Sequence, residues 1–84
     1  MRSYQLNISS PDGKMFSGEV VMLTLRGIEG DLAVLADHVP FITSVKPCDV
    51  KLLLPDGTEK IGHSGGGLLT VAKQEVTLLG SFSW

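Results

Sequence analysis

The tripeptide Pro-Asp-Gly occurs twice, at Pro11–Gly13 and at Pro55–Gly57, each time between short segments of alternating apolar and polar residues. In this tripeptide the proline sets φ for the first turn position, the aspartate side chain caps the turn, and the glycine accepts a positive φ. Before the first turn, apolar side chains stand at every second position: Tyr4, Leu6 and Ile8. This is the period of a strand with one buried face, so the pattern predicts β-hairpins.

The rest of the chain follows the same pattern. Strands are predicted in the segment GEVVMLTLR at 18–26, in DLAVLAD at 31–37, and in two runs that meet at Lys73 and Gln74. No stretch longer than about ten residues keeps the apolar period of a helix. With 84 residues and no linker, residues 1–84 are predicted to form one all-β domain, a sandwich or small barrel of about eight strands.

One predicted strand is apolar on both faces for part of its length. Within 18–26, alternate apolar residues define one face, and Val20 and Met22 belong to the other. A chain this small has no third layer to cover that second face. Hydrophobic residues make up 43% of the chain and charged residues only 19%, which fits a partner-covered surface. Val20, Met22 and Leu53 are therefore predicted to lie wholly or partly exposed in the isolated domain.

Composition argues against several classes of function. The net charge is −2 and the seven Lys and Arg residues form no basic stripe, which argues against binding to nucleic acid or anionic lipid. The single Cys48 cannot form an intrachain disulfide, which favours a reducing compartment. The first ten residues lack the apolar core of a signal peptide, and no run approaches the ~18 apolar residues of a membrane-spanning helix. Neither feature is expected.

Catalytic and metal sites have weak support. His38, His63 and Cys48 share no spacing typical of a metal site, so we expect none. Asp37 and His38 could be imagined in a nucleophilic triad, but no serine stands in a GxSxG turn. His38 could also sense pH. A polar loop contact is the simpler interpretation.

Two further motifs allow alternatives. Three glycines, Gly65–Gly67, could cradle a phosphate, but they lack the residues of a P-loop and no predicted helix follows. They are instead expected to mark a bulge or a close approach of two backbones. Glu29 and Asp31 flank Gly30 and could act as an acid/base pair. With nothing apolar directly around them, we expect charge complementarity at the rim of an interface.

The order of three motifs resembles the N-terminal domain of the epsilon subunit of bacterial F-type ATP synthases. These motifs are SPDGKMFSGEV at 10–20, GIEGDLAVLADHVPFITSVKP at 27–47 and SGGGLLTVAKQEVTLL at 64–79. The resemblance spans nearly the whole chain. It departs from the family's usual glycine or proline-glycine at three places: Ala33, Ala36–Asp37 and Cys48. The family fold implied is a flattened β-sandwich of two antiparallel sheets with about ten short strands.

The resemblance also implies a function. In the family this domain belongs to the central rotor stalk, links the gamma subunit to the c-ring, and helps to couple proton or sodium transport to ATP synthesis. It has no catalytic residues or cofactor, and it is peripheral to the cytoplasmic face of the bacterial plasma membrane. A free-standing β-sandwich that binds a ligand or a protein is the alternative.

Individual residues acquire expected roles in the same way. Glu29, Gly30 and Asp31 match positions that face the polar loops of the c-ring. The expected gamma-subunit contacts are Ser10, Val20, Met22, His38 and Thr43. The family's C-terminal helical hairpin, which is regulatory, has no counterpart before Trp84. The 84-residue chain is therefore expected neither to inhibit ATP hydrolysis nor to bind ATP.

Overall fold

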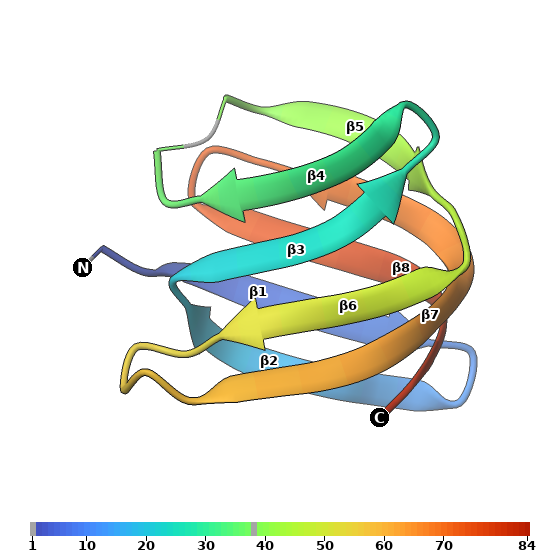
Figure 1. The fold of residues 1–84 in the computed structure, drawn as a ribbon, viewed down its shortest axis with the longest axis horizontal. Coiled ribbons are helices and arrows are strands. Elements are labelled where there is room, and N and C mark those ends of the chain that lie inside the picture. The colour runs from blue at the N-terminus through green and yellow to red at the C-terminus, as the bar shows by residue number, and fades with distance from the viewer. Residues whose placement is uncertain (1, 38) are drawn as a thin grey trace.

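The computed structural model describes residues 2–37 and 39–84, which form strands and turns without a helix (Figure 1). Eight strands follow one another along the chain: β1 (Tyr4–Ser10), β2 (Gly13–Val20), β3 (Met22–Gly27), β4 (Gly30–Leu35), β5 (Phe41–Val45), β6 (Cys48–Leu53), β7 (Glu59–Val71) and β8 (Glu75–Ser83). The all-β prediction is confirmed.

The strands form two layers that share the long strand β7 (Figure 1). One layer has the order β2-β1-β8-β7-β5, and in the other β4, β3 and β6 lie beside the first half of β7. Because β7 has 13 residues and pairs in both layers, eight strands build the sandwich for which the family resemblance implied about ten. The pairings are antiparallel except that β1 and β8 run parallel.

The glycine run lies where β7 passes from one layer to the other. The β7–β8 register shifts between Ser64 and Gly66, and Gly66 has a φ of 109°. A Cβ added at Gly67 would lie 2.0 Å from the carbonyl oxygen of Leu79, and one added at Gly80 would lie 2.4 Å from that of Gly66. Two backbones thus meet closely beside a bulge, as predicted, because only glycine leaves room for them.

Both Pro-Asp-Gly turns are confirmed, but they are capped differently. In the turn between β6 and β7, the Asp56 Oδ1 accepts a 2.9 Å hydrogen bond from the Thr58 amide, which lowers the pKa of the Asp56 carboxyl. In the turn between β1 and β2, the Ser10 Oγ accepts a 3.2 Å bond from the Asp12 amide. Ser10 therefore has a local structural role in this turn.

Inward-facing residues of both layers form one apolar core, which corrects the prediction for Val20. Val20 is 0% exposed and packs in this core. The segment 18–26 is not one strand: β2 ends at Val20, and Val21 forms a bend whose amide donates a 2.7 Å hydrogen bond to the Leu53 carbonyl. This bend interrupts the alternation of inward-facing and outward-facing side chains, so the neighbouring residues Val20 and Val21 are both buried.

An aromatic cluster covers an irregularity at the edge of the sandwich. Met15 is the extra residue of a bulge in β2, and its carbonyl accepts a 3.1 Å hydrogen bond from the Trp84 indole. The Trp84 ring meets Phe82 edge-on, with centroids 5.0 Å apart, and the Lys60 ammonium lies 4.6 Å from the Trp84 centroid. These contacts hold the C-terminal residue against edge strand β2.

Candidate functional site

The hairpin between β3 and β4 carries the acidic turn identified in the sequence. Gly27 and Gly30 pair across it, so that Ile28 and Glu29 form the turn. The Ile28 amide donates a 3.2 Å hydrogen bond to the Ser44 carbonyl, which ties the hairpin to β5. Gly30 has a φ of 125°, a conformation that side chains rarely adopt. The backbone thus fixes the acidic turn beside β5.

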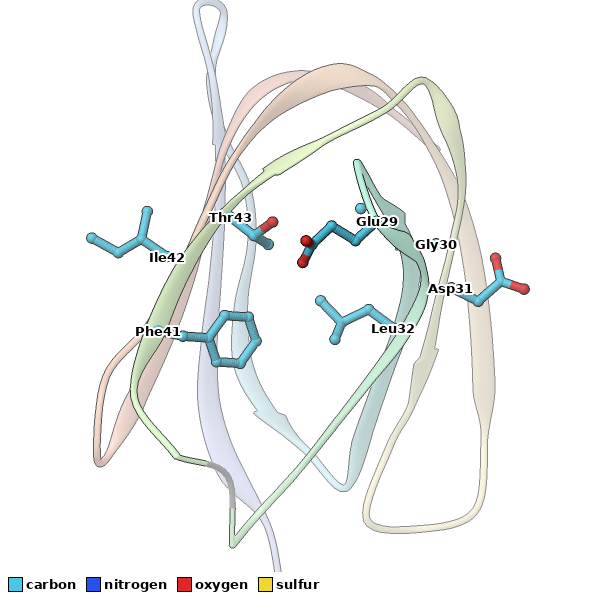
Figure 2. A pocket seen from close by; sticks show the side chains of 8 residues that line it. Glu29, Gly30, Asp31, Leu32, Phe41, Ile42 and Thr43 are labelled. Atoms are coloured by element: carbon cyan, nitrogen blue, oxygen red, sulfur yellow. The ribbon is translucent and has the colours of Figure 1, made fainter.

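A pocket of about 320 Å³ opens between this hairpin and β5. Figure 2 shows the side chains of Leu32 and Phe41 directed into it, and the Glu29 carboxylate directed across it toward Thr43. The Asp31 side chain points away from the pocket (Figure 2). The pocket thus combines one carboxylate, one hydroxyl and an apolar floor.

The two acids of the turn have different electrostatic surroundings. The Asp31 Oδ1 lies 2.9 Å from the Arg26 Nε, and both side chains are largely exposed. Glu29 forms no ion pair or hydrogen bond with any residue in 2–37 or 39–84. Of the two carboxylates, Glu29 therefore remains open to a cation from outside the chain.

Of the residues assigned by resemblance to the gamma subunit, those that the structure describes do not lie together on one surface. Ser10 ends β1 and Met22 begins β3, and Figure 1 shows the end of β1 and the start of β3 at opposite ends of the sandwich. Thr43 lines the same pocket as Glu29, Gly30 and Asp31, which were assigned to the c-ring. Val20 is buried in the core, and His38 lies outside the described residues. The structure thus groups Thr43 with the acidic turn.

Apolar side chains form a row across the outer face of β4, β3 and β6. Met22 is directly opposite Leu35 on one side and Leu53 on the other. Leu35 is 52% exposed, and Met22 and Leu53 are partly buried. Partial exposure of Met22 and Leu53 agrees with the prediction from the sequence, which missed Leu35. We call these three residues the leucine-methionine row.

A second apolar patch, also missed, lies on the outer face of the other layer. Leu68 and Leu79 are cross-strand partners on β7 and β8, and Ile42 lies on neighbouring β5. All three are exposed, Ile42 by 66%. The sequence contains a pattern that could have identified these three exposed residues, because each stands next to an apolar residue that is buried or half-buried. Two adjacent apolar residues in a strand point to opposite faces, so one of them faces outward.

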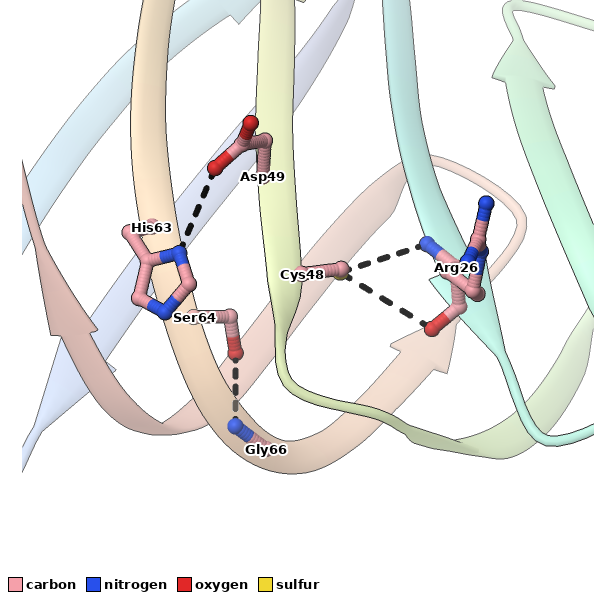
Figure 3. A network of polar contacts seen from close by, with 6 residues as sticks. All are labelled: Arg26, Cys48, Asp49, His63, Ser64 and Gly66. Carbon is pink, nitrogen blue, oxygen red and sulfur yellow. Dashed lines mark hydrogen bonds and ion pairs between the residues drawn. The ribbon is translucent and has the colours of Figure 1, made fainter.

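The polar side chains on β3, β6 and β7 form pairwise contacts (Figure 3). The His63 Nδ1 lies 3.3 Å from the Asp49 Oδ1 at an exposed position, and the Cys48 Sγ accepts a 3.4 Å hydrogen bond from the Arg26 amide. Over residues 2–37 and 39–84, no three His, Cys, Asp or Glu side chains converge as metal ligands would. Asp37 forms an ion pair with Arg2. A search of the same residues for a helix able to cross a membrane finds none.

Sequence comparisons agree with one another. The sequence model of the family described as "ATP synthase, Delta/Epsilon chain, beta-sandwich domain" matches residues 3–81. A protein of Psychrobacter sp. (strain PRwf-1) named ATP synthase epsilon chain is 37% identical over 79 residues, which are 94% of this chain and 57% of the relative. The ATP synthase epsilon chain of Dichelobacter nodosus (strain VCS1703A) is 37% identical over 76 residues, 90% of this chain and 53% of the relative. The chain thus spans little more than half the length of these relatives.

Solved structures share the fold. A chain in the cryo-EM structure of the Euglena gracilis mitochondrial ATP synthase, which contains OSCP, F1 and the c-ring, matches with a TM-score of 0.85 and 22% identity. The match covers 92% of this chain and 49% of that one. A chain in the central stalk and c-ring structure of the Tetrahymena thermophila mitochondrial ATP synthase matches with a TM-score of 0.71 and 12% identity, over 89% of this chain and 62% of that one.

Proposed function

Because the chain belongs to the delta/epsilon family of ATP synthase β-sandwich domains, we propose that it is a domain of the central rotor stalk of an F-type ATP synthase. The match of the family over residues 3–81 is the observation that carries this proposal. In this role the domain links the gamma subunit to the c-ring and couples proton or sodium transport to ATP synthesis. It contributes rigidity and contact surface, whereas catalysis takes place in other subunits.

The architecture suits transmission of torque. A rotor element has to resist twisting between its two partners, so its layers have to be connected stiffly. Here β7 runs through both layers, and the core is formed from inward-facing residues of both. Close packing of such a core makes it poorly compressible. The connections between β1 and β2 and between β3 and β4 are each two residues long, so they add little flexible backbone.

The outer surfaces supply two chemically different contacts. The leucine-methionine row offers an apolar face for gamma, where Met22 retains its proposed role. The acidic turn at Glu29 offers a charged rim for basic c-ring loops, because complementary charge increases the association rate and sets the register. Ser10, His38 and Thr43 remain predicted gamma contacts by resemblance, although Thr43 shares the pocket of the acidic turn.

The relatives named above are bacterial proteins. We propose accordingly that the chain is peripheral to the plasma membrane at its cytoplasmic face, held there through the complex and without inserting into lipid. No nucleic acid or cofactor is part of this proposal.

Co-purification with the gamma subunit and c-ring of the same organism tests the proposal. Gamma that binds the folded domain should also raise its melting temperature, with about 2.7 kcal/mol of stabilisation when free gamma is at 100 times its dissociation constant. An unchanged melting temperature at saturating gamma, together with no co-purification, would contradict the stalk role. It would instead favour the alternative of a free-standing binding module, for which the pocket lined by Glu29, Phe41 and Thr43 is one candidate cavity.

A further inference from the structure

The pocket between β4 and β5 has the size and lining of a socket for one side chain. Its volume of about 320 Å³ lies at the lower end of the range for small-molecule sites, about 300–1,000 Å³. It is open to solvent at the end of the sandwich and has an apolar floor formed by Leu32 and Phe41. A socket of this kind suits a long side chain from another protein better than it suits a nucleotide.

The charge of the lining selects a cation. Among the described residues of the lining, the two ionisable ones are acids, Glu29 and Asp31, and none is a lysine or arginine. Asp31 is paired with Arg26 and points away, which leaves Glu29 as the carboxylate directed into the pocket. Thr43 stands across from it and offers a hydroxyl oxygen as an acceptor.

The apolar floor favours arginine over lysine. The aliphatic part of either side chain can pack on Leu32. A guanidinium is planar and weakly hydrated, so it can stack on the Phe41 ring while it donates two parallel hydrogen bonds to a carboxylate. An ammonium is a compact, strongly hydrated charge and loses more hydration on entering the same place.

We propose that this pocket receives a single arginine side chain of a partner protein, with Glu29 as its carboxylate partner, Phe41 as its stacking surface and Thr43 as a second acceptor. The identity of that protein as a stalk or ring subunit rests on the proposed function, whereas the chemistry of the socket does not. The inference assigns Thr43 and Glu29 to one contact and gives Asp31 a structural role in the hairpin through Arg26.

The test uses the 84-residue chain and a pair of matched small probes. N-acetyl-argininamide carries the guanidinium, and N-acetyl-citrullinamide is its neutral isostere. In ¹H–¹⁵N NMR titrations we expect the arginine probe to shift the amide signals of Gly27, Gly30, Leu32 and Thr43, with a dissociation constant on the order of 1–10 mM. The citrulline probe should leave these signals nearly unchanged.

Substitutions distinguish binding of the probe in the socket from a general attraction to the negative charge of the chain. Glu29→Gln is expected to weaken the arginine probe about threefold or more, because the charged partner is lost. The remote Glu75→Gln removes the same charge and should leave its affinity unchanged. Phe41→Leu should reduce the preference for the arginine probe over N-acetyl-lysinamide. Amide signals far from the pocket monitor the fold of each variant.

Two results would overturn the inference: equal binding of the arginine and citrulline probes, or equal loss of affinity in Glu29→Gln and Glu75→Gln. No binding by the wild-type chain up to about 50 mM probe, well above the expected dissociation constant, would also overturn it. These outcomes are independent of the rotor proposal. Gamma and c-ring could still co-purify with a chain whose pocket binds no arginine, and the pocket could bind the probe even if neither subunit did.

Discussion

The hydroxyl of Tyr4 donates a 2.7 Å hydrogen bond to the backbone carbonyl of Val34, joining β1 in one layer to β4 at the edge of the other. Tyr4 is 5% exposed, so this bond is shielded from water. Tyr4→Phe keeps the ring but removes the donor. We expect it to lower the free energy of unfolding by about 1–3 kcal/mol, because a buried acceptor loses its partner. Chemical denaturation followed by the fluorescence of Trp84, the one tryptophan of the chain, measures the change.

The same residue makes stability depend on alkaline pH. Burial raises the pKa of the Tyr4 hydroxyl far above its usual value, although a backbone hydrogen bond with Leu23 opposes part of this rise. Above about pH 10 the unfolded chain loses the tyrosine proton while the folded chain keeps it, so stability falls as the pH rises. Denaturation from pH 8 to pH 11 should show a steeper decline for wild type than for Tyr4→Phe. Parallel curves would mean that Tyr4 ionises normally in the folded state.

The close approach of the β7 and β8 backbones at Gly67 leads to a prediction for stability. Gly67→Ala would put a Cβ 2.0 Å from the Leu79 carbonyl oxygen, and backbone cannot yield as a flexible side chain can. We expect a loss of about 3 kcal/mol or more. Gly18→Ala is the matched control, because its Cβ would lie 3.4 Å from the end of the Phe16 ring. Similar melting temperatures for the two variants would show that β7 and β8 can separate without cost.

The leucine-methionine row is expected to bind gamma. Leu35→Lys puts a charge at an exposed position of the row and should weaken gamma binding about tenfold, while stability changes by no more than about 0.5 kcal/mol. Ile42→Lys introduces the same charge on the outer face of the opposite layer and serves as the control. Titration of gamma against each variant by calorimetry distinguishes them. If Ile42→Lys were the weaker binder, gamma would dock on the other layer.

The 84-residue chain is expected to join the rotor without regulating it. The glycine run considered above as a phosphate cradle is filled by the approach of β8, so the sandwich offers no cradle there. Adding it to an epsilon-depleted enzyme should leave ATP hydrolysis uninhibited, and calorimetry should detect no ATP binding in the micromolar range. Strong inhibition or micromolar binding would assign these functions to the sandwich itself.

Local features of this fold could be predicted from the order of residues alone. Alternation in Tyr4, Leu6 and Ile8 identified a half-buried strand, and both Pro-Asp-Gly turns closed the expected hairpins. These predictions succeed because a strand's pleat and a turn's dihedral angles depend on neighbouring residues. The glycine run was also informative, since few other roles suit three consecutive glycines within a strand.

Contacts between residues far apart in the sequence could be identified only from the folded structure. No residue near Val21 in the sequence predicts the bend that places Val20 in the core, because the bend depends on a hydrogen bond to Leu53, thirty-two residues away. The parallel pairing of β1 with β8 likewise joins the two ends of the chain. Glu29 and Asp31 look equivalent in the sequence. Their side chains leave the hairpin in different directions, so one meets Arg26 and the other faces Thr43 and Phe41 across a pocket that three-dimensional packing creates.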